Sequence, residues 1–295
     1  MSVLTDRNGR NVVFKVLIYA GMGIFIFSVL YPLYYLLMYS LSTYGGLAGE
    51  HNPLMLVPAG FTLLGYEKLL SQDYIRSGFM VTIFRSLVGP GATGFCTAIT
   101  AYPLAKKDLP GRKVFTWFLM INMFFTGGLI PTFMVVNSLK LTNTIWALIL
   151  PGAVPLGNVI LLMNAFRGVP KSLEEAAMID GGSQWVILLK VFLPVVKPTL
   201  AAVTLFTIVG HWNDYFSALV YITDTANYPL QTYIQQLNVD ITEVTDPDKL
   251  EQLARISSRT LNSAKIVVST IPLLMIYPFM QKYFVSGIVV GSVKE

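Results

Sequence analysis

Residues 170–194 read PKSLEEAAMIDGGSQWVILLKVFLP, a mixed stretch between two long apolar blocks. Ser172, followed three positions later by Glu175, matches a capping box, in which each side chain accepts a hydrogen bond from the other residue's backbone amide. Small and apolar residues then recur at helical spacing, and Gly181 supplies a left-handed stop. We expect a short amphipathic helix here and a second helical segment over 183–192. On the capping pattern alone, a plain connector in which Glu175 only caps a helix is an equal alternative.

The composition of the whole chain points to a membrane protein. Of its 295 residues, 54% are hydrophobic and only 13% are charged, and the mean hydropathy is +0.60. Soluble domains carry about 25% charged residues. The low charge therefore argues against an ordinary globular enzyme.

The apolar residues gather in six blocks, each long enough to cross a bilayer core of about 30 Å as a helix. We therefore expect an all-α polytopic membrane protein with six transmembrane helices, forming a single transmembrane domain over 1–295. Glycines and prolines interrupt the third, fourth and sixth blocks. The blocks are Val12–Leu41, Phe79–Leu104, Val114–Val136, Thr144–Phe166, Leu200–Ile222 and Ala264–Tyr283.

The distribution of basic residues gives an orientation. Thirteen of the 21 Lys and Arg fall on one side if the N-terminus is cytoplasmic, and the other eight, Arg85 among them, are assigned to the opposite side. By the positive-inside rule we expect both termini, including a tail at 284–295, in the cytoplasm, with 223–263 as an extracytoplasmic loop. The same scatter of charge argues against nucleic-acid binding. The single cysteine, Cys96, excludes an intrachain disulfide.

The motif of the 170–194 stretch resembles the EAA loop of binding-protein-dependent ABC importer permeases. Glu175-Ala176-Ala177, Gly181 and Leu193-Pro194 stand at the family's spacing, with Val191 where the family has Ile. Ile179-Asp180-Gly181 is similar to the variant found in the sugar-transporting branch.

Two further segments support the carbohydrate branch of this family. Residues 212–216, WNDYF, resemble the signature of carbohydrate permeases of the maltose-permease type, and the glycine-rich end of the chain resembles their tail. The resemblance spans residues 12–295 and is nearest to the subgroup that serves alginate or pectin oligosaccharides.

The resemblance implies a type I importer permease (MetI-like) fold and a function. The chain would be the transmembrane permease subunit of an ATP-driven oligosaccharide importer in the bacterial inner membrane. Its partners would be a homologous permease, two ATP-binding cassette subunits and an extracytoplasmic solute-binding protein. The chain has no Walker A motif, so ATP and Mg would be bound by the ATPase subunits, and we expect no cofactor or metal in this chain. The residues implied in ATPase coupling are Ser172, Glu174, Glu175, Ala176, Ala177, Asp180, Gly181, Leu193 and Pro194.

Ionisable residues inside a span are costly and normally face a cavity or a partner. His211 and Asp214 satisfy this description, and neighbouring aromatic and amide side chains suit sugars. The predicted substrate pathway is His211, Trp212, Asn213, Asp214, Tyr215 and Phe216. The alternative function is a proton-coupled secondary transporter that uses His211 and Asp214. An intramembrane enzyme has little support, since the chain has neither an HExxH zinc motif nor a Gly-x-Ser-x-Gly nucleophile motif.

Overall fold

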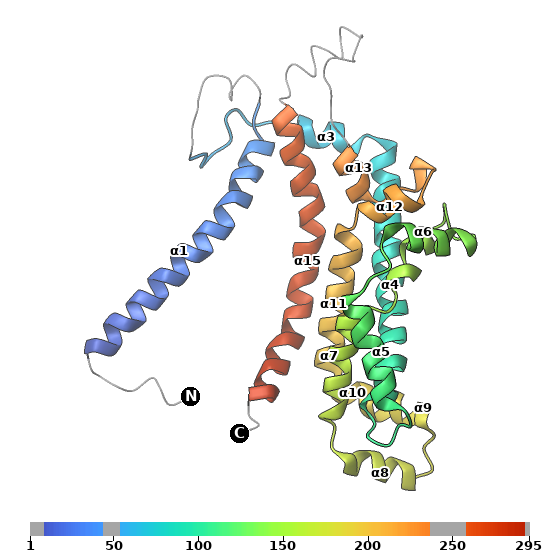
Figure 1. The fold of residues 1–295 in the computed structure, drawn as a ribbon. Coiled ribbons are helices and arrows are strands. Elements are labelled where there is room, and N and C mark those ends of the chain that lie inside the picture. The colour runs from blue at the N-terminus through green and yellow to red at the C-terminus, as the bar shows by residue number, and fades with distance from the viewer. Residues whose placement is uncertain (1–8, 44–53, 237–257, 293–295) are drawn as a thin grey trace. The chain divides into compact units, whose positions relative to one another are not determined.

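The computed structural model describes residues 9–43, 54–236 and 258–292, and these are mostly helical, with one isolated β-bridge between Ser42 and Phe61. The chain divides into two compact units, whose helices are labelled in Figure 1. The first comprises residues 1–71 and 238–270, and the second comprises 72–237 and 271–295.

The first unit holds α1 (Gly9–Ser40), α3 (Leu64–Leu70) and the beginning of α15 (Ser258–Ser292). Polar contacts join these helices: the hydroxyl oxygens of Ser40 and Tyr66 lie 2.5 Å apart, and the Thr260 hydroxyl donates to the Ser42 carbonyl at 3.4 Å. Gly65 marks the place where α3 lies close to α15, because a Cβ there would be at ordinary van der Waals distance from Thr260.

The second unit is built around α4 (Asp73–Ala105), which packs against α7 (Leu156–Arg167) and α11 (Lys197–Asn213). It also contains the part of α15 from Ile271 onward and α5 (Arg112–Phe124), α6 (Leu129–Ser138), η1 (Ile145–Leu148), η2 (Leu150–Gly152), α8 (Lys171–Ile179), α9 (Gln184–Ile187), the π-helix η3 (Leu188–Phe192), α10 (Leu193–Val195), α12 (Phe216–Tyr221), η4 (Thr225–Asn227) and α13 (Leu230–Gln236).

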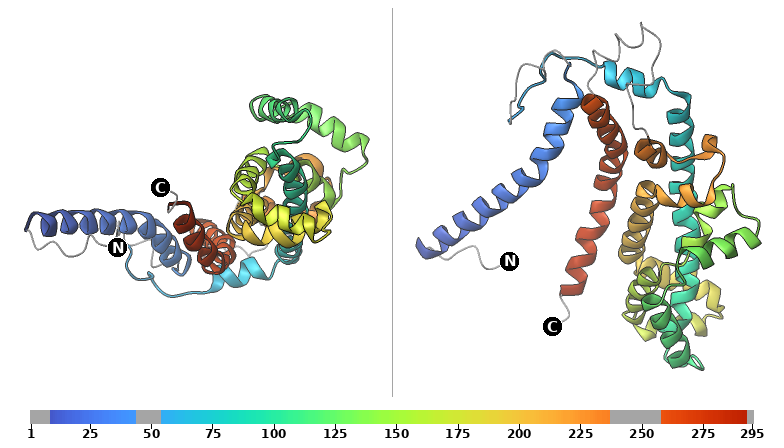
Figure 2. Two further views of the ribbon diagram at one scale, coloured as in Figure 1. Left: turned by 90° about the horizontal axis from the view of Figure 1, so that it is seen from below. Right: turned by 45° about the horizontal axis from the view of Figure 1, so that its top comes forward.

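The core of this unit lies where α4, α7 and the α9–α10 segment meet. Its buried members include Ala98, Ala101, Tyr102, Leu104, Val159, Leu162, Phe166, Ile187, Leu188 and Phe192. Small residues on α4 let the other helices approach closely, and the three aromatic rings pack edge to face. Seen from below, α9–α10 lies across the end of the bundle (Figure 2).

Three helices of the described residues are long and apolar enough to cross a membrane, and up to six crossings result if each bent helix pair is one span. The bends are 114° between α5 and α6, 50° between η1–η2 and α7, and 85° between α9–α10 and α11. The expected interruptions of the third and fourth blocks are therefore confirmed.

Two boundaries differ from the sequence-based expectation. The fifth block was expected to be helical through Ile222, but α11 ends at Asn213 and α12 begins at Phe216. The sixth block was expected to break at its prolines, but α15 continues through Pro272 and Pro278 to Ser292, and so includes most of the expected tail. A helix in this setting tolerates proline when neighbouring groups or local adjustment satisfy the freed carbonyl.

Most of the expected outer loop lies outside the described residues. Asp224 is described and caps η4 by accepting from the Ala226 amide, and Ile234 lies in α13. The rest of the loop up to residue 257 is not described, and it includes the acidic residues Asp240, Glu243, Asp246, Asp248 and Glu251.

Candidate functional site

The first helix of the 170–194 stretch, α8, begins two residues earlier than the capping box requires. Pro170 occupies the N-cap position with extended backbone, and no side chain caps the helix. Ser172 therefore lies inside the first turn, where its own backbone is helical. The expected Ser172–Glu175 capping box is wrong, because proline, whose ring fixes φ, already sets the turn into the helix.

The end of α8 is as expected. Gly181 has φ +78°, and its amide donates to the Met178 carbonyl at 3.0 Å, while the Gly182 amide donates to the Ala177 carbonyl at 2.9 Å. These two bonds form a Schellman motif, which favours glycine because of its left-handed residue. A Cβ on Gly182 would also lie 2.7 Å from the Ala177 carbonyl oxygen.

The second helical segment begins at Ser183, whose hydroxyl accepts from the Val186 amide at 3.4 Å. It runs through α9, the π-helix η3 and α10, so the expected segment is confirmed and extends to Val195. Leu193 packs on the core, and Pro194 is exposed at the N-terminal turn of α10.

The side chains of α8 divide between two directions. Glu174 and Ala177 are half-buried toward the bundle, and the other side chains of the helix are exposed. Ile179 is 86% exposed, and Leu173 and Met178 are exposed as well. The exposed side chains of α8 also include Ser172, Glu175 and Ala176, and Asp180, the C-cap residue, is exposed as well. An apolar group of this kind, beyond the spans and beside carboxylates, is typical of a protein-docking surface.

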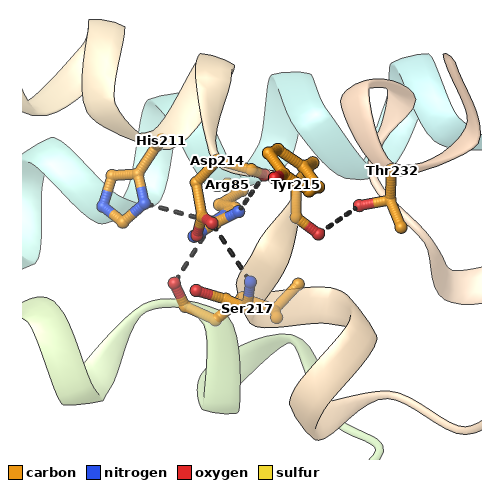
Figure 3. Close-up of polar contacts among 7 residues, drawn as sticks. Arg85, His211, Asp214, Tyr215, Ser217 and Thr232 are labelled. Carbon is orange, nitrogen blue, oxygen red and sulfur yellow. Dashed lines mark hydrogen bonds and ion pairs between the residues drawn. The ribbon is translucent and has the colours of Figure 1, made fainter. Parts of the chain in front are cut away.

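A buried polar cluster lies inside the bundle, around Arg85 of α4 (Figure 3). The guanidinium forms an ion pair with the Asp214 carboxylate and donates to the Asp214 carbonyl at 3.2 Å. Its Nε donates to His211 Nδ1 at 3.1 Å and to the Leu148 carbonyl at 3.2 Å. The Arg85 side chain is only 2% exposed, and these partners compensate its charge and its N–H groups.

The cluster supplies hydrogen-bond partners for the backbone groups at the break between α11 and α12. The carbonyls of Asp214 and Tyr215 have left the helical pattern; Arg85 donates to the first and the Thr232 hydroxyl donates to the second at 3.0 Å. The Asp214 carboxylate accepts from the Ser217 amide at 3.1 Å and from its hydroxyl, which starts α12. Irregular backbone at membrane depth needs such partners.

Gly89, one turn after Arg85 on α4, makes room for the histidine of the cluster. A Cβ on Gly89 would overlap the His211 imidazole. The close approach of α4 and α11 at this level therefore depends on a residue without a side chain.

The cluster borders a cavity of about 510 Å³. Its lining includes Arg85, His211 and Asp214 together with Asn158, Ser217 and Tyr221. Trp212 is buried with its ring 6.5 Å from that of Phe79, and Asn213, Tyr215 and Phe216 are exposed. Of the six predicted pathway residues, His211 and Asp214 are thus the two that border this cavity.

Sequence reasoning missed Arg85, which it counted in a connector. The structure corrects this, because Arg85 lies within α4 and is buried. The signal was present, since Arg85 is the only charged residue of the block Phe79–Leu104 and a lone charge in a span needs a partner.

Within the described parts of the chain, no three His, Cys, Asp or Glu residues come together in a way that could hold a metal ion. The two candidate sites are therefore built from hydrogen bonds, ion pairs and apolar contacts.

Residues 92–290, about two-thirds of the chain, match the family model of the binding-protein-dependent transport system inner membrane component. The chain belongs to this family. The match includes both the α8–α10 loop and the His211–Asp214 region, and it identifies the long apolar helices as those of an inner membrane protein.

Relatives of this inner membrane component include transport permeases of known cargo. The chain is 36% identical to the polygalacturonan/rhamnogalacturonan transport system permease protein YtcP of Bacillus subtilis, over 97% of this chain and 99% of that one. It is 39% identical to protein LplC of the same organism, over 89% and 88%. A solved chain from a bacterial ABC transporter involved in importing the acidic polysaccharide alginate is similar at 30% identity, with a TM-score of 0.85 and coverage of 95% and 99%.

Membership of this family supports the expected ABC permease and gives no support to a proton-coupled transporter. The geometry agrees, because His211 and Asp214, the two groups that such a transporter would titrate, are both bound to Arg85.

Proposed function

We propose that this chain is the permease subunit of an ATP-driven oligosaccharide importer, forms half of the translocation pathway, and receives the force of ATP-driven closure through α8. The observation that carries the coupling role is the helix α8 itself: it lies outside the bundle, has no buried residue and exposes Ile179 beside Glu175. A helix that exposes large apolar groups fits a cleft on another protein.

The proposed assembly contains a homologous second permease, two ATP-binding cassette subunits that bind ATP and Mg, and an extracytoplasmic solute-binding protein. In the proposed orientation both termini and α8 face the cytoplasm, and the loop after α12 faces outward. The bent helix pairs support a pathway between two permeases, because breaks leave backbone groups that a water-filled route tolerates.

The proposed cargo is an oligosaccharide, and the relatives' cargoes favour fragments of acidic polysaccharides such as pectin. The cavity beside Arg85, His211 and Asp214 offers both donors and acceptors, with Tyr221 as an aromatic face. Sugars present hydroxyl groups and apolar ring faces, so this mixture suits them.

Two substitutions test the coupling role. Glu175→Lys reverses an exposed charge on α8, and Gly181→Leu forces a side chain onto a left-handed residue. Both proteins are expected to reach the membrane but to lose ATP hydrolysis stimulated by the binding protein loaded with pectin oligosaccharides, in proteoliposomes of the complete complex. Unaltered stimulation in both variants would contradict the proposed function.

A further inference from the structure

Lys106, at the C-terminal end of α4, holds the α8 helix through an ion pair with Glu174. Its Nζ lies 4.4 Å from the centre of the Tyr102 ring and 4.5 Å from that of Phe192. The Lys106 and Glu174 side chains are only 16% and 17% exposed. The ammonium group thus contacts two aromatic rings and a carboxylate in a largely shielded place, where both interactions are stronger than at an exposed surface.

A second connection starts from the same turn of α4. The Tyr102 hydroxyl donates to Gln184 Oε1 of α9 at 2.8 Å. The Tyr102 ring also packs edge to face on Phe166 of α7 and Phe192 of the π-helix. The last turn of α4 is therefore attached to the 170–194 stretch on both sides of its glycine turn.

Two attachments restrict motion more than one. A single contact to α8 would let the helix pivot about Gly181, whereas contacts to both α8 and α9 fix its direction relative to α4. The neighbouring charges play no such part: Lys107 and Glu175 are exposed. Glu174, and not the motif residue Glu175, is the carboxylate that faces the bundle.

We propose that Lys106 is a positioning residue that locks α8–α10 to α4, so that a push on α8 moves α4 with it as one body. The source of that push rests on the proposed function; the lock itself does not. Arg85 lies 21 residues before Lys106 on the same helix, or about 32 Å at the rise of an α-helix. Through α4, a displaced α8 would act directly on the polar cluster and on the break after α11.

The test is a distance measurement between spin labels on the two parts. Cys96, the only cysteine, is replaced by alanine, and labels are attached at exposed Leu87 on α4 and exposed Lys171 on α8. The distance distribution is recorded by double electron–electron resonance in the complex purified with its native partners, after removal of the partners' cysteines.

The variant is Lys106→Met, which keeps an aliphatic stem and removes the charge, and the matched control is Lys107→Met. The wild type and Lys107→Met are expected to give one narrow distance. Lys106→Met should broaden it, with the ratio of locked to unlocked molecules falling roughly 5- to 30-fold, the factor for losing a shielded cation–π contact. Lys106→Arg, which restores the cation, should recover the narrow distribution.

Glu174→Gln removes the ion pair from the other side, keeps Lys106 between its rings, and serves if Lys106→Met does not fold. It should broaden the distribution less than Lys106→Met. An unchanged distribution in both variants, or equal broadening in Lys107→Met, would overturn the lock.

Trapping the complex with MgATP and vanadate separates this proposal from the proposed function. If α8 and α4 move as one body, the wild-type distance is the same before and after trapping, and it changes only in Lys106→Met. If trapping changes the distance in the wild type as much as in Lys106→Met, α8 and α4 do not move as one body and the proposal is overturned. If no ATPase subunit co-purifies with the chain, the proposed function fails, while the nucleotide-free comparison still tests the lock.

Discussion

Arg85 and Asp214 are the residues on which the interior of the second unit depends. The Arg85 guanidinium forms an ion pair with the Asp214 carboxylate and donates to two backbone carbonyls and a histidine nitrogen. These partners come from η1, from α11 and from the break after α11. Because these partners are buried together, the loss of one leaves the others without compensation.

Arg85→Met is expected to destabilise the folded protein by about 3 kcal/mol, since breaking a buried ion pair leaves an uncompensated charge. Arg85→Met combined with Asp214→Asn should be less harmful than Arg85→Met alone. The measurement is the thermal unfolding midpoint of the purified protein in detergent. A double variant less stable than Arg85→Met would contradict the idea that the pair acts as a unit.

Gly89→Ala is expected to lower the unfolding midpoint, because the new Cβ would overlap the His211 imidazole. Gly91→Ala is the matched control: it lies on the same helix, and a Cβ there meets nothing within 4 Å. Since alanine is a better helix former than glycine by up to about 1 kcal/mol, the control should be neutral or stabilising. Equal effects in the two variants would show that the approach of α4 to α11 is not limiting.

At the scale of elements, helix caps make a separate prediction. Ser183 caps α9 through the Val186 amide, whereas Ser172 caps nothing. Ser183→Ala should therefore cost about 0.5–1 kcal/mol of local stability, and Ser172→Ala should cost little. Hydrogen exchange of the α9 amides reports the difference. Faster exchange of the α8 amides in Ser172→Ala would contradict this expectation, because it would show that Ser172 does cap α8.

The elements also show what sequence could predict. Hydropathy located the apolar blocks, and Gly127-Gly128 marked the break between α5 and α6, because block length and backbone freedom are local properties. The helical loop after Pro170 was predicted as well. The end of α11 at Asn213 was missed, since the break is stabilised by Arg85 and Thr232 from distant helices.

The same reason explains the missed site residues. Lys106 and Gln184 look like ordinary connector residues until the fold brings Glu174 and Tyr102 to them. The role of Trp212 in the substrate pathway, predicted from its residue type, stays a prediction, and its burial against Phe79 depends on how α4 and α11 pack. Pairings between separate helices are not encoded in local spacing.

At the scale of the whole molecule, one chain contains the exposed helix α8, the long helix α4 joined to it through Lys106, and the polar cluster around Arg85. Family membership establishes an inner membrane component of a binding-protein-dependent transport system. The proposed coupling adds to this family membership a route for movement within the chain, from α8 through α4 to the break after α11.

The most direct test of this coupling is photo-crosslinking from Ile179, the most exposed large hydrophobic side chain among the described residues. A photoreactive amino acid is placed there, and at exposed Phe124 of α5 as the control, in the complex with its native partners. The account predicts a crosslink to an ATP-binding cassette subunit from Ile179 and none from Phe124. A complex that contains the ATPase but gives no crosslink from Ile179 would contradict it.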